Sequence, residues 1–401
     1  MHNTKHLIAL TAFGLFSIMP ILSFATTFSG RLSIVGSAME EKTATADQQS
    51  FRAMLENSND LSEWSIHVKT RRQNFRNLDY PLTHSSEVFR FHKLSEDWID
   101  NEREDGKTQV GYAVDQIYYR HRFDAAVLGV GRQPVDFGSG RFWQPLNIFG
   151  SFSAIDLDTD YKPGIDAAIL DWYPSPFSSL KIAYVLAPEN KQEIKDSSAL
   201  YYRSQIGDSS EISLLAANVV DNTIIGGSFE TDWNGFGLRL EGAYYELQQN
   251  AYNSQQQGLF WIAGADYQFS NGLFLSFELY DNALGASKQE NLAQQLQQEL
   301  IAKGIVLQLS RHLVAMGMGN ELTPLLRWDY SFLLSRLENN KGSHNTSNLH
   351  QLSLSYSIAE NSDCIFSILS ANGRDLSQSN LPRSEFGHIP ASISFRLRHY
   401  F

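Results

Sequence analysis

Ten cationic side chains occupy alternate positions in segments whose intervening residues are largely apolar. They are Lys69, Arg71, Arg120, Arg122, Arg132, Arg203, Arg239, Arg327, Arg396 and Arg398. Four acids share the same polar faces, and these are Glu241, Asp266, Glu278 and Asp329. Arginine presents several N–H donors in a planar fork, so such a face favours anions and, beside aromatic rings, also suits neutral sugars. In the alternative interpretation, many of these cations pair with the acids and only rigidify the structure.

A second group of residues has the spacing of a calcium loop. Asp156, Asp158 and Asp160 follow the one-three-five pattern, but Tyr161 replaces the glycine that such loops require. We therefore interpret these residues as solvated acids and predict no metal site and no cofactor.

One serine and one histidine could belong to a hydrolase. Ser310 and His312 lie two residues apart on one strand face, and hydrolysis would also require an orienting acid or amide. A chain with 11 histidines offers such pairs by chance. We therefore predict no catalytic residues, with a lipid hydrolase as an alternative.

The composition excludes several classes of protein. The 401 residues carry 32 Lys and Arg against 44 Asp and Glu, and this acidic balance argues against a nucleic-acid partner. The chain is 42% hydrophobic and 19% charged, which is too apolar for a disordered protein. A lone cysteine, Cys364, excludes an intramolecular disulfide framework. Past residue 25 no apolar run approaches the ~20 residues of a membrane-spanning helix.

The first 25 residues have the pattern of a secretory signal peptide. Lys5 precedes an apolar stretch from Leu7 to Leu22, and Ala25 provides a small residue for cleavage. A retained membrane anchor is the alternative. We expect an exported chain whose mature domain is residues 26–401.

Apolar residues recur with a period of two along most of the remaining chain. Leu326, Trp328 and Tyr330 share one face of a segment, and Arg327 and Asp329 share the other. This period indicates β-strands with one apolar and one wet face. Over the chain, the polar positions hold mainly Ser, Gln, Gly, Tyr and Arg, which is typical of a water-filled lumen.

The alternation predicts eighteen strands, with sixteen as the second choice. They are 28–36, 61–71, 86–94, 109–122, 125–136, 165–173, 179–187, 198–206, 210–219, 223–231, 235–247, 257–269, 272–283, 304–315, 324–336, 348–358, 362–371 and 389–401. Long and short connections should alternate along the chain. Two connections break this rule, because 72–85 is long for a short turn and 220–222 is short for a loop.

The fold class follows from the backbone. Inside hydrocarbon every amide must be hydrogen-bonded, which permits only helices or closed barrels, and helices are already excluded. We therefore predict an all-β, closed, antiparallel transmembrane barrel with long extracellular loops and short periplasmic turns. A ring of this size encloses more space than side chains fill, so an aqueous passage is expected.

Phe395, Leu397 and the final Phe401 lie on the apolar face of the last predicted strand. In this the C-terminus resembles that of the outer-membrane β-barrel proteins of Gram-negative bacteria, although His399 stands where this class usually has an apolar residue. The resemblance implies that these three residues form the signal read by the barrel-assembly machinery. It also implies residence in the outer membrane, among lipid and lipopolysaccharide.

A segment over residues 130–166 is similar to one in porin-like and polysaccharide-export-like barrels. It contains Val130–Pro134, then the Gly-rich bend Phe137–Pro145, then Tyr161–Asp166. We hypothesise that residues 138–164 enter the lumen as a constriction, with Arg141, Phe142 and Trp143 near the narrowest point. The alternative is an external loop that caps the barrel.

These features together predict a porin-like channel for passive diffusion of small hydrophilic solutes, with a mild preference for anions or sugars. The ten cations would line the pore. A polysaccharide export conduit, a lipid hydrolase and an adhesin or anchor are the alternatives. Trimers occur among porins, and nothing in the sequence requires or forbids a homotrimer.

Overall fold

The computed structural model describes residues 26–40, 44–76, 91–93, 98–100, 108–150, 159–188, 195–248, 256–374, 376–377 and 381–401. Its strands are β1 (Thr27–Met39), β2 (Ala44–Ser58), β3 (Ser62–Arg76), β4 (Trp98–Asp100), β5 (Thr108–Arg122), β6 (Ala126–Gln133), β7 (Ile165–Ser175), β8 (Ser178–Val185), β9 (Ser197–Ile206), β10 (Ser210–Val219), β11 (Asn222–Trp233), β12 (Phe236–Glu246), β13 (Gln257–Gln268), β14 (Phe274–Asn282), β15 (His312–Thr323), β16 (Leu326–Glu338), β17 (His344–Ala359), β18 (Ser362–Asn372) and β19 (Ser392–Tyr400). Three short helices follow β14, namely η3 (Gln289–Asn291), η4 (Ala293–Gln297) and α2 (Glu299–Ala302).

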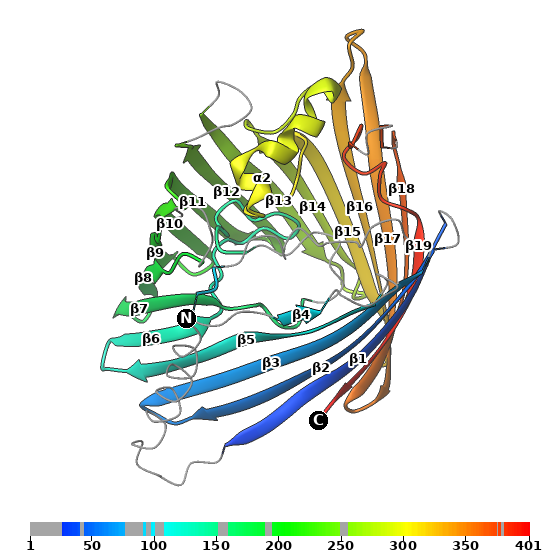
Figure 1. Ribbon diagram of the computed structural model, residues 1–401. Coiled ribbons are helices and arrows are strands. Elements are labelled where there is room, and N and C mark those ends of the chain that lie inside the picture. Colours follow the sequence, from blue (N-terminus) through cyan, green and yellow to red (C-terminus); the bar gives the residue numbers. More distant parts are fainter. Residues whose placement is uncertain are drawn as a thin grey trace, which may run out of the picture.

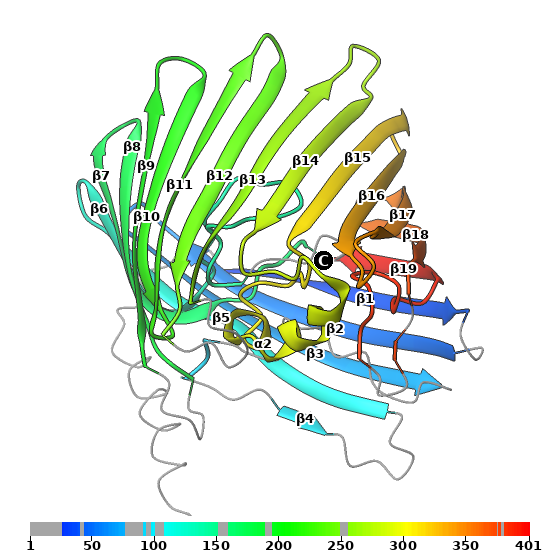
Figure 2. The ribbon, with the colours of Figure 1, turned by 90° about the horizontal axis from the view of Figure 1, so that it is seen from above.

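The strands form one closed antiparallel ring (Figures 1 and 2). Consecutive strands are neighbours, and β1 closes the ring by pairing with both β2 and β19. The three-residue strand β4 is not a member of the ring, because β3 pairs directly with β5, and β4 adds to β5 beyond the end of β6. The ring therefore has eighteen strands, which confirms the predicted closed barrel and excludes the sixteen-strand alternative.

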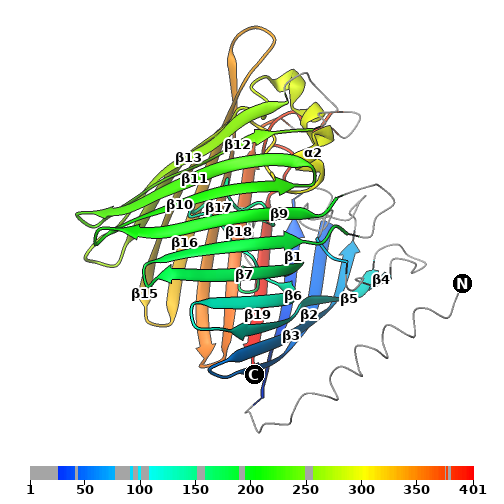
Figure 3. The same cartoon turned by 90° about the vertical axis from the view of Figure 1, so that its left-hand side faces the viewer.

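The two faces of the wall differ as the alternation predicted. On β1, Leu32 and Ile34 are 47% and 54% exposed on the outside, whereas Arg31 and Ser33 are 2% and 4% exposed on the inside. The same pattern continues around the ring, and Figure 3 shows the neighbouring strands β9, β10 and β11 of this wall. An apolar outer surface on this scale is unfavourable in water and favourable in hydrocarbon. Among the described residues, no helix is long and apolar enough to cross a membrane.

Short turns and long loops lie at opposite ends of the barrel. The start of β1, the C-terminal Phe401 and turns such as Asn234–Gly235 lie at one end, and the described parts of the long connections 134–164, 283–311 and 373–391 lie at the other. Asn234 and Gly235 have φ of 53° and 84°, as a two-residue hairpin turn requires. At the loop end, Val220 and Asp221 make an equally tight turn with positive φ, so the short connection noted in the sequence is real.

Three strand predictions need correction. Residues 44–58 were expected within a loop, but they form β2. The half of β2 nearer the loop end carries Asp47 and Gln49 on its outward face, so apolar alternation is missing there. The strand predicted at 86–94 is not formed at residues 91–93, and its other residues lie outside the described part. These two errors cancel in the strand count. The strand predicted at 304–315 begins only at His312, because Ile305 and Val306 are buried in the interior core rather than facing outward.

Candidate functional site: the inner wall of the barrel

The loop between β6 and β7 runs inside the ring and is held there by two buried glutamates (Figure 1). Glu241 of β12 is 0% exposed and accepts hydrogen bonds from the backbone N–H groups of Ser139, at 2.6 Å, and Leu146, at 2.7 Å. Gly138 has φ of +95° beside this carboxylate, and a side chain at Gly140 would collide with the carbonyl oxygen of Trp143. Glycine is therefore required at both positions of the bend.

Glu278 of β14 makes the second attachment. Its carboxylate accepts the backbone N–H groups of three consecutive residues, Arg141 at 2.9 Å, Phe142 at 3.1 Å and Trp143 at 2.9 Å. Successive N–H groups that converge in this way form a natural site for an anion. Tyr245 of β12 adds a 2.8 Å hydrogen bond to the carbonyl oxygen of Pro145. Both glutamates were predicted to face water in the lumen, and instead they are covered by the loop.

The three residues predicted for the constriction have different surroundings. Trp143 is 3% exposed and packs against Tyr280, with ring centroids 5.0 Å apart, and Phe142 is partly buried against the same core. The side chain of Arg141 is 50% exposed, lies 3.5 Å from Asp266 and stands over the ring of Phe274. Of the three, only Arg141 presents a largely open side chain, and its role at a narrow point stays a prediction.

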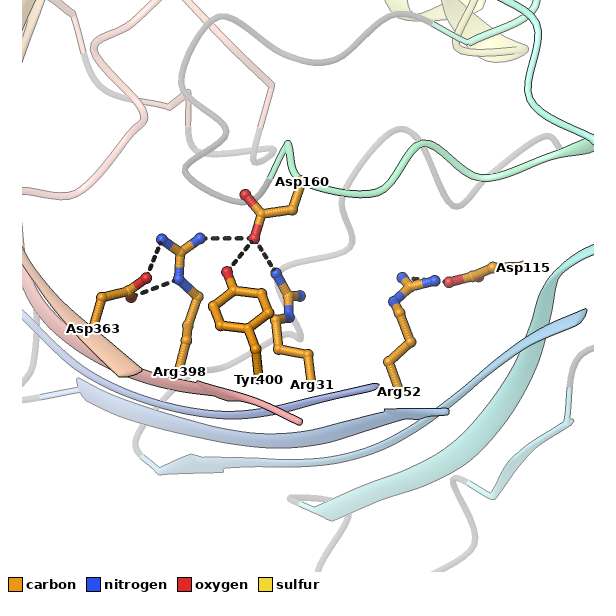
Figure 4. Close-up of polar contacts among 7 residues, drawn as sticks. All are labelled: Arg31, Arg52, Asp115, Asp160, Asp363, Arg398 and Tyr400. Atoms are coloured by element: carbon orange, nitrogen blue, oxygen red, sulfur yellow. Dashed lines mark hydrogen bonds and ion pairs between the residues drawn. The ribbon is translucent and has the colours of Figure 1, made fainter. Parts of the chain in front are cut away.

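The returning part of the same loop contacts the wall formed by β19, β1 and β2 (Figure 4). One oxygen of Asp160, Oδ2, accepts hydrogen bonds from Arg31 Nη1 at 2.7 Å, Arg398 Nη1 at 2.8 Å and Tyr400 Oη at 2.7 Å. Arg398 also makes a two-pronged pair with Asp363 of β18, at 2.8 and 3.0 Å. The carboxylate thus joins the loop to two wall arginines at once.

Tyr161 extends this contact to the next strands. The guanidinium groups of Arg31 and Arg52 lie over its ring, 5.1 and 4.5 Å from the centroid, and His67 meets its edge. Arg52 pairs with Asp115 of β5 at 2.5 Å, and both side chains are nearly buried. We call Arg31, Arg52, Arg398, Asp115, Asp160 and Asp363 the wall cluster. Its three arginines are matched by three carboxylates.

Most of the ten predicted cations are already paired. Within the described part of the chain six of them contact acids, in the pairs Arg120–Glu63, Arg132–Asp166, Arg203–Glu211, Arg239–Asp266, Arg327–Asp329 and Arg398–Asp363. Lys69, Arg71 and Arg396 lie on inward positions of β3 and β19, and Arg122 is exposed near the short-turn end. The alternative interpretation, in which such arginines rigidify the wall, therefore accounts for more than half of them.

Arg132 requires a specific correction. It was predicted to line the pore, but both it and Asp166 are 0% exposed. Arg132 donates to the two oxygens of Asp166, at 2.7 and 3.1 Å, and to the carbonyl oxygen of Val114 at 2.7 Å. A side chain enclosed in this way contacts no permeating solute and acts as a structural tie between β5, β6 and β7.

Two further loops pack into the interior. Glu385, in the loop between β18 and β19, is 7% exposed and accepts the backbone N–H groups of Leu309 at 3.1 Å and Ser310 at 2.7 Å. Burial raises the pKa of Glu385, although its bonds to Ser310 and Leu309 oppose the rise. Phe386 joins Ile305 and Val306 in the same hydrophobic core. The loops 283–311 and 373–391 thus brace one another beside the first loop.

The hydrolase pair is not brought together. Ser310 is 0% exposed, and its Oγ accepts a 2.8 Å hydrogen bond from Ser335. His312 is on the outward face and lies 2.7 Å from Asp281. A nucleophile and base on opposite sides of the wall cannot share a proton.

Asp160 was considered in the sequence only for its calcium-like spacing. Asp156 and Asp158 lie outside the described residues, and the described part contains no cluster of His, Cys, Asp and Glu suited to a metal ion. Arg31, Arg52, Asp115, Asp363 and Tyr400 were missed as members of a site. Alternation alone places Arg31 on the wet face of β1, but Arg52 was hidden because β2 had not been recognised.

The last strand closes the barrel with aromatic contacts. Phe395 and Leu397 face outward, at 51% and 38% exposed. The Phe401 ring lies 5.7 Å from that of Phe28 and stacks on Phe51 at 5.9 Å, and its backbone exchanges two hydrogen bonds with Gly30. The predicted role of Phe395, Leu397 and Phe401 as an assembly signal stays a prediction.

Solved structures share this architecture, whereas no family model and no curated protein matches the sequence. OccAB2 from Acinetobacter baumannii aligns with a TM-score of 0.59 at 8% identity, over 94% of this chain and 98% of that one. OccAB4 from the same organism gives 0.58 at 10% identity, over 93% and 96%. The outer membrane protein OprD from Pseudomonas aeruginosa gives 0.55 at 11% identity, over 94% and 93%. The chain therefore has the fold of these outer-membrane β-barrels.

Proposed function

We propose that this protein is a porin-like channel of the Gram-negative outer membrane through which small hydrophilic solutes diffuse passively. The observation that carries the proposal is a closed eighteen-strand ring with an apolar exterior and a charged, hydroxyl-rich inner wall. Barrels of sixteen to eighteen strands are wide enough for an aqueous passage. The shared fold with the outer membrane protein OprD supports the same placement.

Selectivity would come from the inward loop and the wall cluster. The described parts of the loop are attached to Glu241 and Glu278 on β12 and β14 and to Arg31 and Arg398 on β1 and β19, so the loop would restrict the space between two parts of the wall. The wall cluster has balanced charges, so we propose only a mild preference for anions or sugars. Arg141, Lys69, Arg71 and Arg396 are the cations we expect a solute to meet.

The partners we propose are the solute, membrane lipid and lipopolysaccharide, and the barrel-assembly machinery that would read the last strand. No cofactor is required, because diffusion needs no chemistry beyond the wall. Each barrel encloses its own passage, so the channel works as a monomer or as a homotrimer, and chemical cross-linking of the protein in detergent would distinguish these states.

Two measurements test this proposal. Liposomes containing the refolded protein should swell in small sugars and progressively less in larger ones, because the loop limits the width. Deleting residues 141–150 should raise the permeability to the larger sugars. Liposomes that do not swell in any sugar would refute the channel, and an unchanged size limit after the deletion would refute the constriction.

The alternatives have less support. Export of a polysaccharide would require a passage wide enough for a chain, and the three interior loops oppose that. Hydrolysis would require Ser310 and His312 to meet, and they are separated by the wall.

A further inference from the structure

The outer surface of the barrel has a groove across β1, β2, β3 and β5, on the side that the proposed membrane placement exposes to lipid. The groove has a volume of 490 Å³. The strand registers place its lining side chains in two rows, Ile34, Gln49 and Arg72 in one, and Leu32, Phe51 and Tyr112 in the other. Leu32, Ile34, Phe51 and Tyr112 are 38–54% exposed, so this floor is apolar and open.

Arg72 is unusual on an apolar outer face. The register partner of Arg72 on β2 is Gln49, and the partner of Gln49 on β1 is Ile34, which faces outward. Register partners point to the same face of a sheet, so the side chain of Arg72 also faces outward. Within the described ranges its guanidinium group has no ion pair or hydrogen bond, and the nearby Asp47 is already engaged by Asn74 at 2.9 and 3.2 Å. A cation facing lipid is costly unless it reaches the interface and meets an anion.

The height of Arg72 along the barrel identifies that interface. Arg72 follows Ser62, the first residue of β3 at the short-turn end, by ten positions. Because about 9–11 residues of a tilted strand cross the hydrocarbon layer, Arg72 lies at the boundary on the loop side. Arg76, four residues further on the same face, adds a second cation above it. With short turns in the periplasm, this boundary belongs to the outer leaflet.

We propose that this groove binds one phosphorylated glycolipid of the outer leaflet, of the lipid A type. An acyl chain would lie along Leu32, Phe51 and Tyr112, and Arg72 would hold a phosphate. Arginine suits this role because its planar fork makes two charge-assisted hydrogen bonds to one phosphate. A second copy of the chain fits less well, since a two-fold contact of this face would oppose the arginines of both copies.

The test is native mass spectrometry of residues 26–401 refolded in non-ionic detergent and titrated with bisphosphorylated hexa-acyl lipid A. We expect one lipid to bind. Arg72→Ala should weaken this binding about tenfold, the loss of one charge-assisted interaction. Thr70→Trp should weaken it similarly, because Thr70 lies between Phe51 and Tyr112 and a large ring there fills the groove. Both side chains face lipid, and heat-dependent gel migration would verify that the variants fold.

Arg336→Ala is the matched control. Arg336 also faces outward, ten positions beyond Leu326 at the start of β16, but it lines no such groove. Its loss should leave the affinity within about twofold, because Arg336 is not among the residues that line the groove where the lipid would lie. Equal loss in both arginine variants, no loss in Arg72→Ala, or undiminished binding of dephosphorylated lipid A would overturn the proposal. So would equally tight binding of phosphatidylglycerol, or a dimer that depends on Arg72.

Discussion

Asp160 is the single side chain whose change should alter ion selectivity most clearly. Its Oδ2 atom holds Arg31, Arg398 and Tyr400, and the wall cluster of three arginines and three carboxylates is neutral only while Asp160 is charged. Asp160→Asn would leave one positive charge in excess. At about 5 Å in water-like surroundings a unit charge changes the energy of a passing ion by about 0.8 kcal/mol, which is roughly a fourfold change in its local concentration.

The assay is the reversal potential across a bilayer with a KCl gradient near 0.1 M, where charges act over about 10 Å. The added charge attracts an anion and repels a cation by the same energy, so the anion-to-cation permeability ratio should rise by up to about sixteenfold in Asp160→Asn. The difference should nearly vanish near 1 M salt, where the screening length is about 3 Å. Asp281→Asn is the control, because it removes the same charge from the outward face beside His312. An unchanged ratio, a shift towards cations, or an equal shift in the control would refute this account of the wall.

Three further predictions concern the inward loop, the outer wall and the buried ion pair between Arg132 and Asp166. Glu278→Ala leaves three backbone N–H groups without their acceptor, so the loop should detach and single-channel current noise should increase. Variant traces as quiet as those of the wild type would contradict this. Leu214→Lys, on an outward side chain 56% exposed, should destabilise the barrel in lipid vesicles by about 2–4 kcal/mol in urea titration, whereas Leu214→Phe should be nearly neutral. Arg132→Ala leaves Asp166 buried without its counter-charge and should lower the free energy of unfolding by about 3–5 kcal/mol in the same titration. The control Arg122→Ala, at the exposed short-turn end, should change it by less than about 0.5 kcal/mol.

The strand ring could be predicted because lipid imposes a simple rule on every outward side chain. Leu326, Trp328 and Tyr330 alternate with polar residues because one face meets hydrocarbon, and that rule places most strands within a few residues. The rule fails for the part of a strand that extends beyond the hydrocarbon layer. The outer half of β2, with Asp47 and Gln49, has no such pattern, and Ile305 and Val306 are apolar because of an interior core that alternation does not reveal.

The candidate site was harder to predict because it depends on which acids meet which cations across the lumen. Alternation puts Glu241, Glu278 and Arg398 on the inner face, but says nothing of the loop that covers the glutamates or of Asp160 reaching the arginine. Arg132 appeared equivalent to the other cations because alternation shows which face of the strand a residue lies on. It does not show whether another segment covers that residue. The Gly-rich bend at 138–140 was the useful signal, since it marked the chain that turns inward.

The central claim is that the ring encloses a continuous aqueous passage, and single-channel recording of refolded residues 26–401 in a planar lipid bilayer tests it most directly. Stepwise current increments that grow in proportion to salt concentration, and a further rise when residues 141–150 are deleted, are the expected result. Insertion of folded protein without any conductance step, in both the full chain and the deletion, would contradict it.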